Sequence, residues 1–165
     1  MNRLVTRPLI LISIPEQRLR LLVERRVVMD VPISSARRGL GEQQGSQQTP
    51  RGWHQIRACI GAGAPAGAVF VGRRPTGEIH TSALALANPQ RDWVLTRILW
   101  LSGLEPGRNR GGERDSARRY IYIHACPASE PLGIPRSHGC IRLSHIDCLD
   151  LFARVSPGTR VFIGG

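Results

Sequence analysis

The sequence predicts a mainly β protein with two or three short helices, folded as one domain over residues 1–165. Short apolar runs rich in β-branched residues recur along the chain and are separated by turn residues such as proline, glycine and serine. Only two segments have the apolar spacing of a helix. A length of 165 residues with 41% hydrophobic residues suits one core and leaves little room for a second.

The first predicted strands lie in the N-terminal third. The apolar run Leu9–Ile14 ends at a Pro-Glu-Gln turn, and Arg18–Val23 then alternates arginine with leucine, so that the two resemble a hairpin. Val27–Ser34 is a further strand, and its proline places it near an edge or a bend. Later strands are predicted at Trp53–Ala58, Val69–Val71, Tyr120–His124 and Arg160–Ile163.

A helix is predicted over Asp92–Gly103. Asp92 is a favourable N-cap, apolar residues then recur at helical spacing, and a glycine ends the segment. Because aromatic residues on such a helix usually pack in a core, we interpret Trp93 and Trp100 as core residues rather than as part of a cofactor site. A second short helix is predicted at Asp147–Val155.

The segment Ser35–Pro50 has almost no apolar residue, which predicts a long surface loop. Loops of this length either serve a functional site or are disordered, and both interpretations stay open. If it is functional, we expect it to flank a site, with Thr49-Pro50-Arg51-Gly52 forming the turn into the next strand. The glycine-rich stretch Gly61–Gly67 lacks the lysine of a phosphate-binding loop, so no nucleotide site is predicted.

All 23 basic residues are arginine, against 12 acidic residues, and the formal charge is +11. This excess suits bidentate binding of carboxylates or phosphates, or it reflects the coding bias of the genome. The arginines are scattered and aromatic residues make up only 5%, so the stacking platform of a nucleic-acid-binding protein is not predicted. Attraction to an anionic polymer or an acidic substrate remains open.

Export and membrane insertion are not predicted. The first apolar run, Leu9–Ile12, is too short for a signal peptide, and no stretch approaches the roughly 20 apolar residues of a membrane span. We therefore expect a cytoplasmic protein, with the periplasm as the alternative. In a reducing compartment the four cysteines are expected to be thiols. We also expect a monomer.

The densest group of reactive residue types lies between His124 and His145. In a strand that ends at His124, the period of two places Tyr120, Tyr122 and His124 on one face and the intervening isoleucines on the other. His124 is therefore expected to point away from the isoleucine face.

Cys140 is the predicted nucleophile. It follows glycine in the string Ser137-His138-Gly139-Cys140-Ile141-Arg142-Leu143, and glycine lets backbone amides approach a reacting carbonyl. A neighbouring histidine and nearby arginines would lower the pKa of the thiol and supply a general base. Cys126 is expected to pack near the cleft, with a reversible disulfide to Cys140 as the alternative.

His124 is the predicted base and His138 a supporting group. Along one strand, His138 and Cys140 would lie about 6 to 7 Å apart. A residue on a paired strand has its Cβ only about 4.5 to 5.5 Å away, which favours His124. Arg142 shares the side of Cys140 and could hold a substrate carboxylate through two hydrogen bonds, or it is an ordinary surface arginine.

A zinc site is the competing interpretation of this cluster. The pairs His124-x-Cys126 and His138-x-Cys140 offer two nitrogens and two sulfurs, as in a zinc-stabilised binding module. The spacing is unusual for zinc, so we expect no metal and no cofactor. Cys59 and Cys148 are interpreted as small buried hydrophobic residues, and His54, His80 and His145 as ordinary surface or packing histidines.

With His124 upstream, the string from Ser137 to Leu143 resembles the signature of the L,D-transpeptidase catalytic domain, also called the YkuD domain. The turn Thr49–Gly52 and the strand-rich start containing Gln17 are similar to the family as well, and the resemblance spans most of the chain. It implies a β-sandwich or barrel with mixed sheets. It also implies a cysteine enzyme that attacks the bond between an L-centre and a D-amino acid in peptidoglycan stem peptides.

The resemblance also implies a role for each site residue. Cys140 would be the nucleophile, His124 the base, and the carbonyl of Ala125 would orient the imidazole. Ala125 departs from the glycine or serine usual in the family, but only its backbone is needed. His138, Gly139 and Cys140 would line the oxyanion hole, and Arg142, with Ser137 and Tyr122, would contact the substrate.

The acyl acceptor depends on the compartment. In the cytoplasm, water would resolve the acyl-enzyme, giving an L,D-carboxypeptidase that trims terminal D-alanine from recycled muropeptides or precursors. Transfer to an amine, with cross-linking or exchange of D-amino acids, is the alternative. The third hypothesis is an inactive relative that binds muropeptides without cleaving them.

Overall fold

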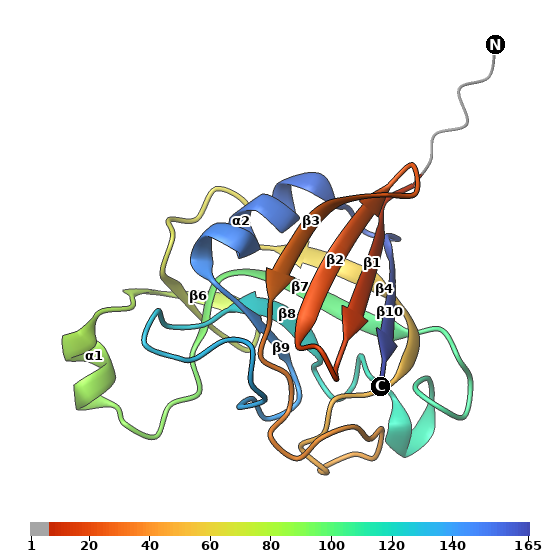
Figure 1. Ribbon diagram of the computed structural model, residues 1–165. Coiled ribbons are helices and arrows are strands. Elements are labelled where there is room, and N and C mark those ends of the chain that lie inside the picture. Colours follow the sequence, from red (N-terminus) through yellow and green to blue (C-terminus); the bar gives the residue numbers. More distant parts are fainter. Residues whose placement is uncertain (1–6) are drawn as a thin grey trace.

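The computed structural model describes residues 7–165, and its regular secondary structure is mainly strand (Figure 1). The mainly β prediction is confirmed. In chain order the elements are β1 (Leu9–Ser13), β2 (Arg18–Val23), β3 (Arg26–Pro32), β4 (Gly52–Ile60), β5 (Ala68–Val71), β6 (Arg74–Ile79), α1 (Ser82–Ala87), β7 (Val94–Gly103), a short 3-10 turn (Gly112–Arg114), β8 (Tyr122–Ala125), β9 (Ile141–Leu143), α2 (His145–Arg154) and β10 (Arg160–Gly164).

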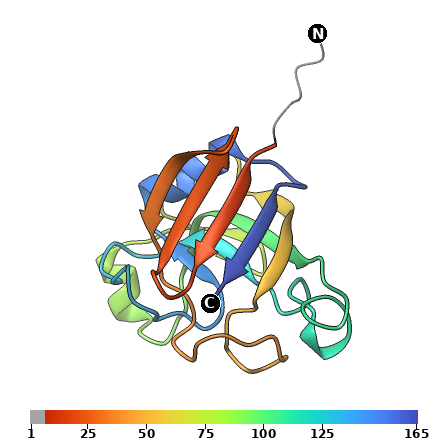
Figure 2. The same ribbon diagram turned by 45° about the vertical axis from the view of Figure 1, so that its right-hand side comes forward.

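The strands form one curled mixed sheet with the order β3-β2-β1-β10-β4-β7-β5-β6. From this path β8 pairs with β7, and β9 pairs with β8. Most pairs are antiparallel, whereas β1 with β10 and β8 with β9 are parallel. Figure 2 shows β3, β2, β1 and β10 side by side as one layer, with β4 next to β10 at its edge and with β7 and β8 behind it. The sheet therefore folds over itself as a sandwich.

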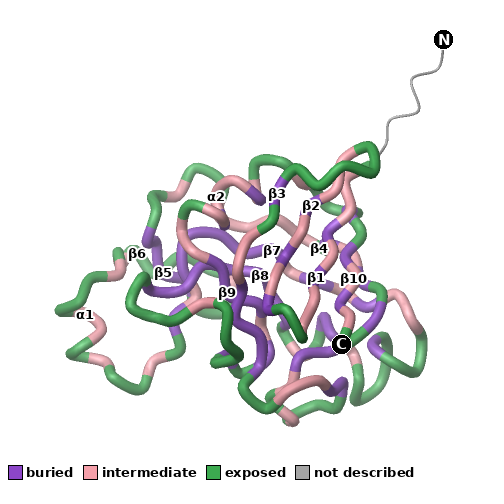
Figure 3. Tube along the Cα trace, viewed as in Figure 1, coloured by how far each residue is buried: buried purple, intermediate pink, exposed green. Residues whose placement is uncertain are grey.

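The main core lies between these two layers (Figure 3). In β2, Leu19 and Leu21 are fully buried while Arg18 and Arg20 ion-pair with Asp30 outside, as the alternating sequence predicts. The opposite layer contributes side chains of β7, β8 and β9. The largest fully buried members of this core are Ile10, Ile12, Leu19, Leu21, Ile33, Ile56, Leu95, Leu99, Leu101, Ile123 and Ile141.

The helix predicted over Asp92–Gly103 is wrong, because this segment is the central strand β7. Leu95, Leu99 and Leu101 face the main core, while Ile98 packs in a second cluster on the other face. The pairing with β8 shifts between Leu95 and Ile98, where the intervening polar residues form a bulge. In this strand, which is buried on both faces and interrupted by a bulge, the apolar residues follow one another at the three- and four-residue spacing that is also typical of an amphipathic helix.

The two helices are short. α2 begins at His145, where the hydroxyl of Ser144 accepts a hydrogen bond from the Asp147 backbone N–H, so the predicted second helix is confirmed with an earlier start. The helix α1 and the strand β6 were not predicted. Within residues 7–165, no helix has the length and apolar character that crossing a membrane requires.

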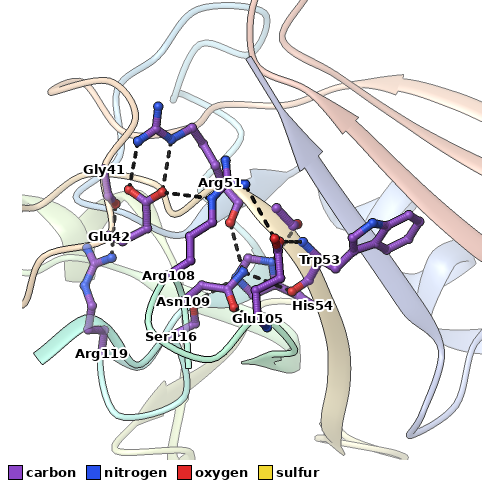
Figure 4. A network of polar contacts seen from close by, with 11 residues as sticks. Gly41, Glu42, Arg51, Trp53, His54, Glu105, Arg108, Asn109, Ser116 and Arg119 are labelled. Atoms are coloured by element: carbon purple, nitrogen blue, oxygen red, sulfur yellow. Dashed lines mark hydrogen bonds and ion pairs between the residues drawn. The ribbon is translucent and has the colours of Figure 1, made fainter. Parts of the chain in front are cut away.

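A polar network fixes two long loops to the start of β4 (Figure 4). Arg51 makes two hydrogen bonds with the carboxylate of the nearly buried Glu42. Asn109 donates to the carbonyls of Arg51 and Trp53, and Glu105 accepts from the Trp53 backbone N–H. Because these bonds join residues far apart in sequence, they hold the loop before β4 and the loop after β7 in one arrangement.

His54 is the buried histidine of this network, so the packing interpretation applies to it. Its ring is fully buried, with Nε2 2.8 Å from the Ser116 hydroxyl and Nδ1 3.0 Å from the Gly52 carbonyl oxygen. Burial lowers its pKa from 6.5 to about 4. His54 is therefore uncharged in the folded protein at neutral pH.

This histidine is expected to make the protein less stable in acid. As the pH falls below 6.5, the unfolded chain takes up a proton at His54 while the folded protein does not. The free energy of unfolding should therefore drop by about 3 kcal/mol between pH 7 and pH 4 from this group alone. Urea denaturation at several pH values measures the drop. In His54→Asn the free energy of unfolding should depend less steeply on pH, because unfolding takes up one proton fewer. An unchanged slope would contradict the assignment.

Candidate active site

The strands β8 and β9 separate two kinds of side chain onto two faces. In their parallel register Ile123 stands beside Ile141, and His124 stands beside Arg142. The isoleucines belong to the main core. Because side chains alternate along a strand, His124 and Arg142 point to the opposite face, as the sequence predicts for His124.

The turn that carries Cys140 precedes β9 and is closed by its own serine. The Ser137 hydroxyl donates to the Cys140 carbonyl oxygen at 2.6 Å and accepts from the Gly139 backbone N–H at 3.2 Å. Gly139 has φ +135°, and a Cβ there would stand 3.3 Å from the carbonyl oxygen of Gln48. A side chain at this position would therefore strain the backbone and crowd the neighbouring loop.

The loop Ser35–Pro50 supports this turn from outside. The Thr49 hydroxyl donates to the Gly139 carbonyl oxygen at 2.9 Å and accepts from the backbone N–H of Ala36 at 2.9 Å. Ala36 in turn forms a parallel bridge with Ser137. The loop Ser35–Pro50 therefore packs against the turn that carries the predicted nucleophile, as its functional interpretation expects.

Arg119 anchors the same loop and was not singled out in the sequence. Its guanidinium donates to the carbonyl oxygens of Gln48 at 2.6 Å and Gly41 at 3.2 Å. Burial lowers the pKa of Arg119, while the nearby Cys140 and Glu42 raise it. A scattered arginine gives no signal of such a contact in a sequence, because its partners are carbonyl groups of the backbone.

Cys140 itself is half-buried and free. Its Sγ lies 3.3 Å from the Tyr122 backbone nitrogen, which donates, and 3.4 Å from the Tyr120 carbonyl oxygen, which accepts the thiol proton. Burial raises the pKa of Cys140 to about 12, although the Tyr122 N–H and the charge of Arg142 oppose the rise. The predicted lowering of this pKa is therefore wrong, and the resting group is a neutral thiol.

His124 has the properties of a neutral base with one orientation. Its Nδ1 lies 2.7 Å from the Ala125 carbonyl oxygen, so Nδ1 carries the proton and Nε2 keeps a free lone pair. Burial lowers its pKa below 6.5, while the Ala125 carbonyl and the Asp92 carboxylate oppose the change. The imidazole is therefore uncharged at neutral pH.

The position of Cys140 relative to His124 in the strand register differs from the expectation. The direct partner of His124 across the strand pair is Arg142, and Cys140 lies before β9 begins, so the two stand diagonally. Within residues 7–165 no hydrogen bond joins the imidazole to the thiol, which bonds the backbone of Tyr120 and Tyr122 instead. The directly opposite placement expected from strand pairing is corrected accordingly.

Asp92 links the other two polar side chains of the site. One of its carboxylate oxygens lies 3.1 Å from Nδ1 of His138, and the other lies 3.1 Å from the guanidinium of Arg142. Arg142 is buried, so it is not an ordinary surface arginine. Partial burial raises the pKa of Asp92, but the hydrogen bond from His138 and the charge of Arg142 outweigh it, and the net pKa lies below its usual range.

The other predicted residues lie close by with their polar atoms engaged. Ser137 is buried, and its hydroxyl is used inside the turn. Tyr122 is buried against the second cluster, and its hydroxyl accepts from Arg73 at 3.0 Å. Cys126 is buried and donates to the Leu143 carbonyl oxygen at 3.6 Å. Substrate contact by Ser137 and Tyr122 remains a prediction.

The zinc interpretation has no support in the structure. Over the part of the chain that the structure describes, no group of three or more histidine, cysteine or acidic side chains is placed to hold a metal ion. His138 is directed to Asp92, and Cys126 is bonded to the backbone of β9.

Comparisons with known proteins identify the family and the fold. The YkuD family model, which describes the L,D-transpeptidase catalytic domain, matches residues 7–163. Among curated proteins nothing matches.

Solved structures show the same fold. The L,D-transpeptidase from Mycobacterium smegmatis is 20% identical with a TM-score of 0.58, and the match covers 97% of this chain and 59% of that one. L,D-transpeptidase 3 from Mycobacterium tuberculosis is 17% identical with a TM-score of 0.60, over 97% of this chain and 62% of that one. The L,D-transpeptidase from Xylanimonas cellulosilytica is 22% identical with a TM-score of 0.54, over 99% of this chain and 63% of that one. The chain thus spans about three fifths of the length of these proteins.

Proposed function

Because the chain belongs to the L,D-transpeptidase catalytic domain family, whose model matches residues 7–163, we propose that it is a cysteine-dependent acyl-transfer enzyme acting on peptidoglycan stem peptides. The observation that carries the proposal is the pair formed by Cys140 and His124. A half-buried thiol lies on a tight turn, and a neutral imidazole, oriented by the Ala125 carbonyl, lies on the adjoining strand with one nitrogen free.

The first chemical step requires the thiol to leave its resting hydrogen bond. Rotation about the Cα–Cβ bond of Cys140 releases Sγ from the Tyr120 carbonyl, and Nε2 of His124 takes the thiol proton. The sulfur then forms a bond to the carbonyl carbon of the scissile peptide. When the carbon–nitrogen bond breaks, the protonated imidazole returns the proton to the leaving amine, and a thioester remains on Cys140.

The oxygen of the attacked carbonyl becomes negatively charged and needs hydrogen-bond donors. The family resemblance assigns this role to the backbone of His138, Gly139 and Cys140. The Gly139 N–H already bonds the Ser137 hydroxyl at 3.2 Å. We therefore propose that the N–H groups of His138 and Cys140 bind the oxyanion, while Ser137 holds the turn in the required conformation.

For the second step we propose water as the acyl acceptor, which makes the enzyme an L,D-carboxypeptidase that releases terminal D-alanine. Transfer to an amine requires a second peptide or an amino acid held beside the thioester, whereas hydrolysis requires only access of water to a half-buried cysteine. We also propose that the enzyme acts in the cytoplasm, since all four cysteines are free, as expected in a reducing compartment. Cell fractionation tests the compartment.

Incubation with a disaccharide tetrapeptide tests the reaction. We expect the mass of the product to show the loss of one D-alanine, with no change in product when a different D-amino acid is added. Incorporation of the added amino acid would show transfer to an amine and would overturn the proposed hydrolysis. Recovery of intact tetrapeptide from a folded enzyme would contradict the proposed acyl-transfer activity itself.

A further inference from the structure

A basic cavity lies next to the proposed catalytic residues and has no role in the mechanism above. It has a volume of about 300 Å³, and His138 and Arg142 form part of its wall. Arg37 and Arg136 complete the side formed by the Ser35–Pro50 loop and the turn before Cys140. A cavity of this size accommodates one residue-sized group of a larger ligand.

Three of the basic side chains that line the cavity are paired with acidic side chains. Arg142 and His138 share the carboxylate of Asp92, and Arg142 also lies 3.7 Å from a carboxylate oxygen of Glu130. Arg91 is held by Glu78 at 2.9 Å. Each of these three side chains therefore already has an acidic partner.

Arg37 and Arg136 have no such partner. Among the residues that the structure describes, neither guanidinium makes a hydrogen bond or an ion pair, and both side chains are exposed to the cavity. Two uncompensated guanidinium groups in one small cavity repel each other and attract an anion. The cavity therefore has the charge that favours binding of an anion.

The backbone of both arginines is fixed relative to the nucleophile turn. The Arg37 N–H donates to the Ser137 carbonyl oxygen at 2.9 Å. The Arg136 N–H donates to the Ser34 hydroxyl at 2.9 Å and to the Ser35 carbonyl at 3.0 Å. An anion bound between these side chains would therefore have a defined position relative to Cys140.

We propose that Arg37 and Arg136 bind a carboxylate of the donor peptide and so select peptides that carry one. This inference rests on the proposed function, because a stem peptide ending in D-alanine has a terminal carboxylate and can carry others on its side chains. A planar carboxylate matches the fork of a guanidinium. The excess of arginine noted in the sequence thus has a specific use at this position.

Peptide binding to the Cys140→Ala protein tests the inference without depending on turnover. We expect the dissociation constant of the tetrapeptide, measured by calorimetry, to rise about tenfold in Arg37→Gln and in Arg136→Gln. Arg38→Gln is the matched control, because Arg38 is the exposed neighbour that does not line the cavity. It should bind as tightly as the parent.

Amidated peptides identify the group that is bound. If the arginines hold the terminal carboxylate, amidation there weakens binding to the parent but not to the two variants. If they hold a side-chain carboxylate, the same pattern appears only when that group is amidated. Unchanged binding in both variants, or an equal loss with charged and amidated peptides, would overturn the proposal. Absence of turnover in the wild type would contradict the acyl-transfer proposal alone.

Discussion

Replacing Cys140 by alanine is expected to abolish cleavage of the stem peptide, lowering kcat on the order of 10⁴-fold or more, as for other nucleophiles. The thiol is the group that forms the acyl-enzyme, and without it water would have to attack the amide directly. Cys140→Ser should also be inactive, because a hydroxyl is a weaker nucleophile and His124 stands diagonally to it. Release of D-alanine followed by mass spectrometry measures the loss.

The fold should survive both substitutions. Cys140 is half-buried at the margin of the second cluster, so removing its sulfur leaves the main core intact. Cys59→Ala is the matched control, since Cys59 is also half-buried and free but lies on β4 and outside the site. It should retain full activity. Turnover by Cys140→Ala near the wild-type rate would contradict the proposed mechanism, as would an acyl adduct on another cysteine.

The raised pKa of Cys140 makes the order of events part of the mechanism. With its pKa at about 12, the thiol is almost entirely protonated at neutral pH. The free enzyme therefore does not hold a thiolate beside an imidazolium, and the proton must move as the substrate is attacked. This arrangement protects the cysteine from reagents that need a thiolate, and it makes the reaction depend on the base.

Local sequence was sufficient to predict much of the local geometry around the candidate site. The period of two in the strand before Ala125 separates His124 from the isoleucines, and β8 has this arrangement. The string from Ser137 to Cys140 predicts a tight turn, which the φ of Gly139 and the bonds of Ser137 form. Both signals lie within a few residues, so no knowledge of distant contacts was needed.

The parts that were not predicted depend on contacts between distant segments. Asp92 was interpreted as a helix cap, but it lies before β7 and binds His138 and Arg142, more than forty residues later. The bulge in β7 disguised a strand as a helix. The burial that raises the pKa of Cys140 comes from the packing of other strands around the turn, which a single sequence does not reveal.

Replacing His124 by glutamine is expected to lower kcat by about 10² to 10⁴-fold at neutral pH, the usual contribution of a general base. Glutamine can still bond the Ala125 carbonyl through its amide N–H, so the local fold should be kept, but it cannot take a proton from Sγ. The control is His145→Gln. His145 is the first residue of α2, and its ring forms a hydrogen bond with the Thr96 hydroxyl. Because it lies outside the proposed mechanism, its replacement should leave the activity unaltered.

The pH profile of the His124→Gln enzyme separates loss of a base from loss of structure. In the wild type the neutral imidazole is the active form and its pKa lies below 6.5, so activity should fall only in acid and reach a plateau near neutral pH. Without the base, attack requires a thiol that ionises by itself. Because burial raises the pKa of that thiol to about 12, the residual rate should climb about tenfold per pH unit through the alkaline range with no plateau. A variant profile that runs parallel to the wild type, only lower, would mean that His124 supports the turn and that another group accepts the proton.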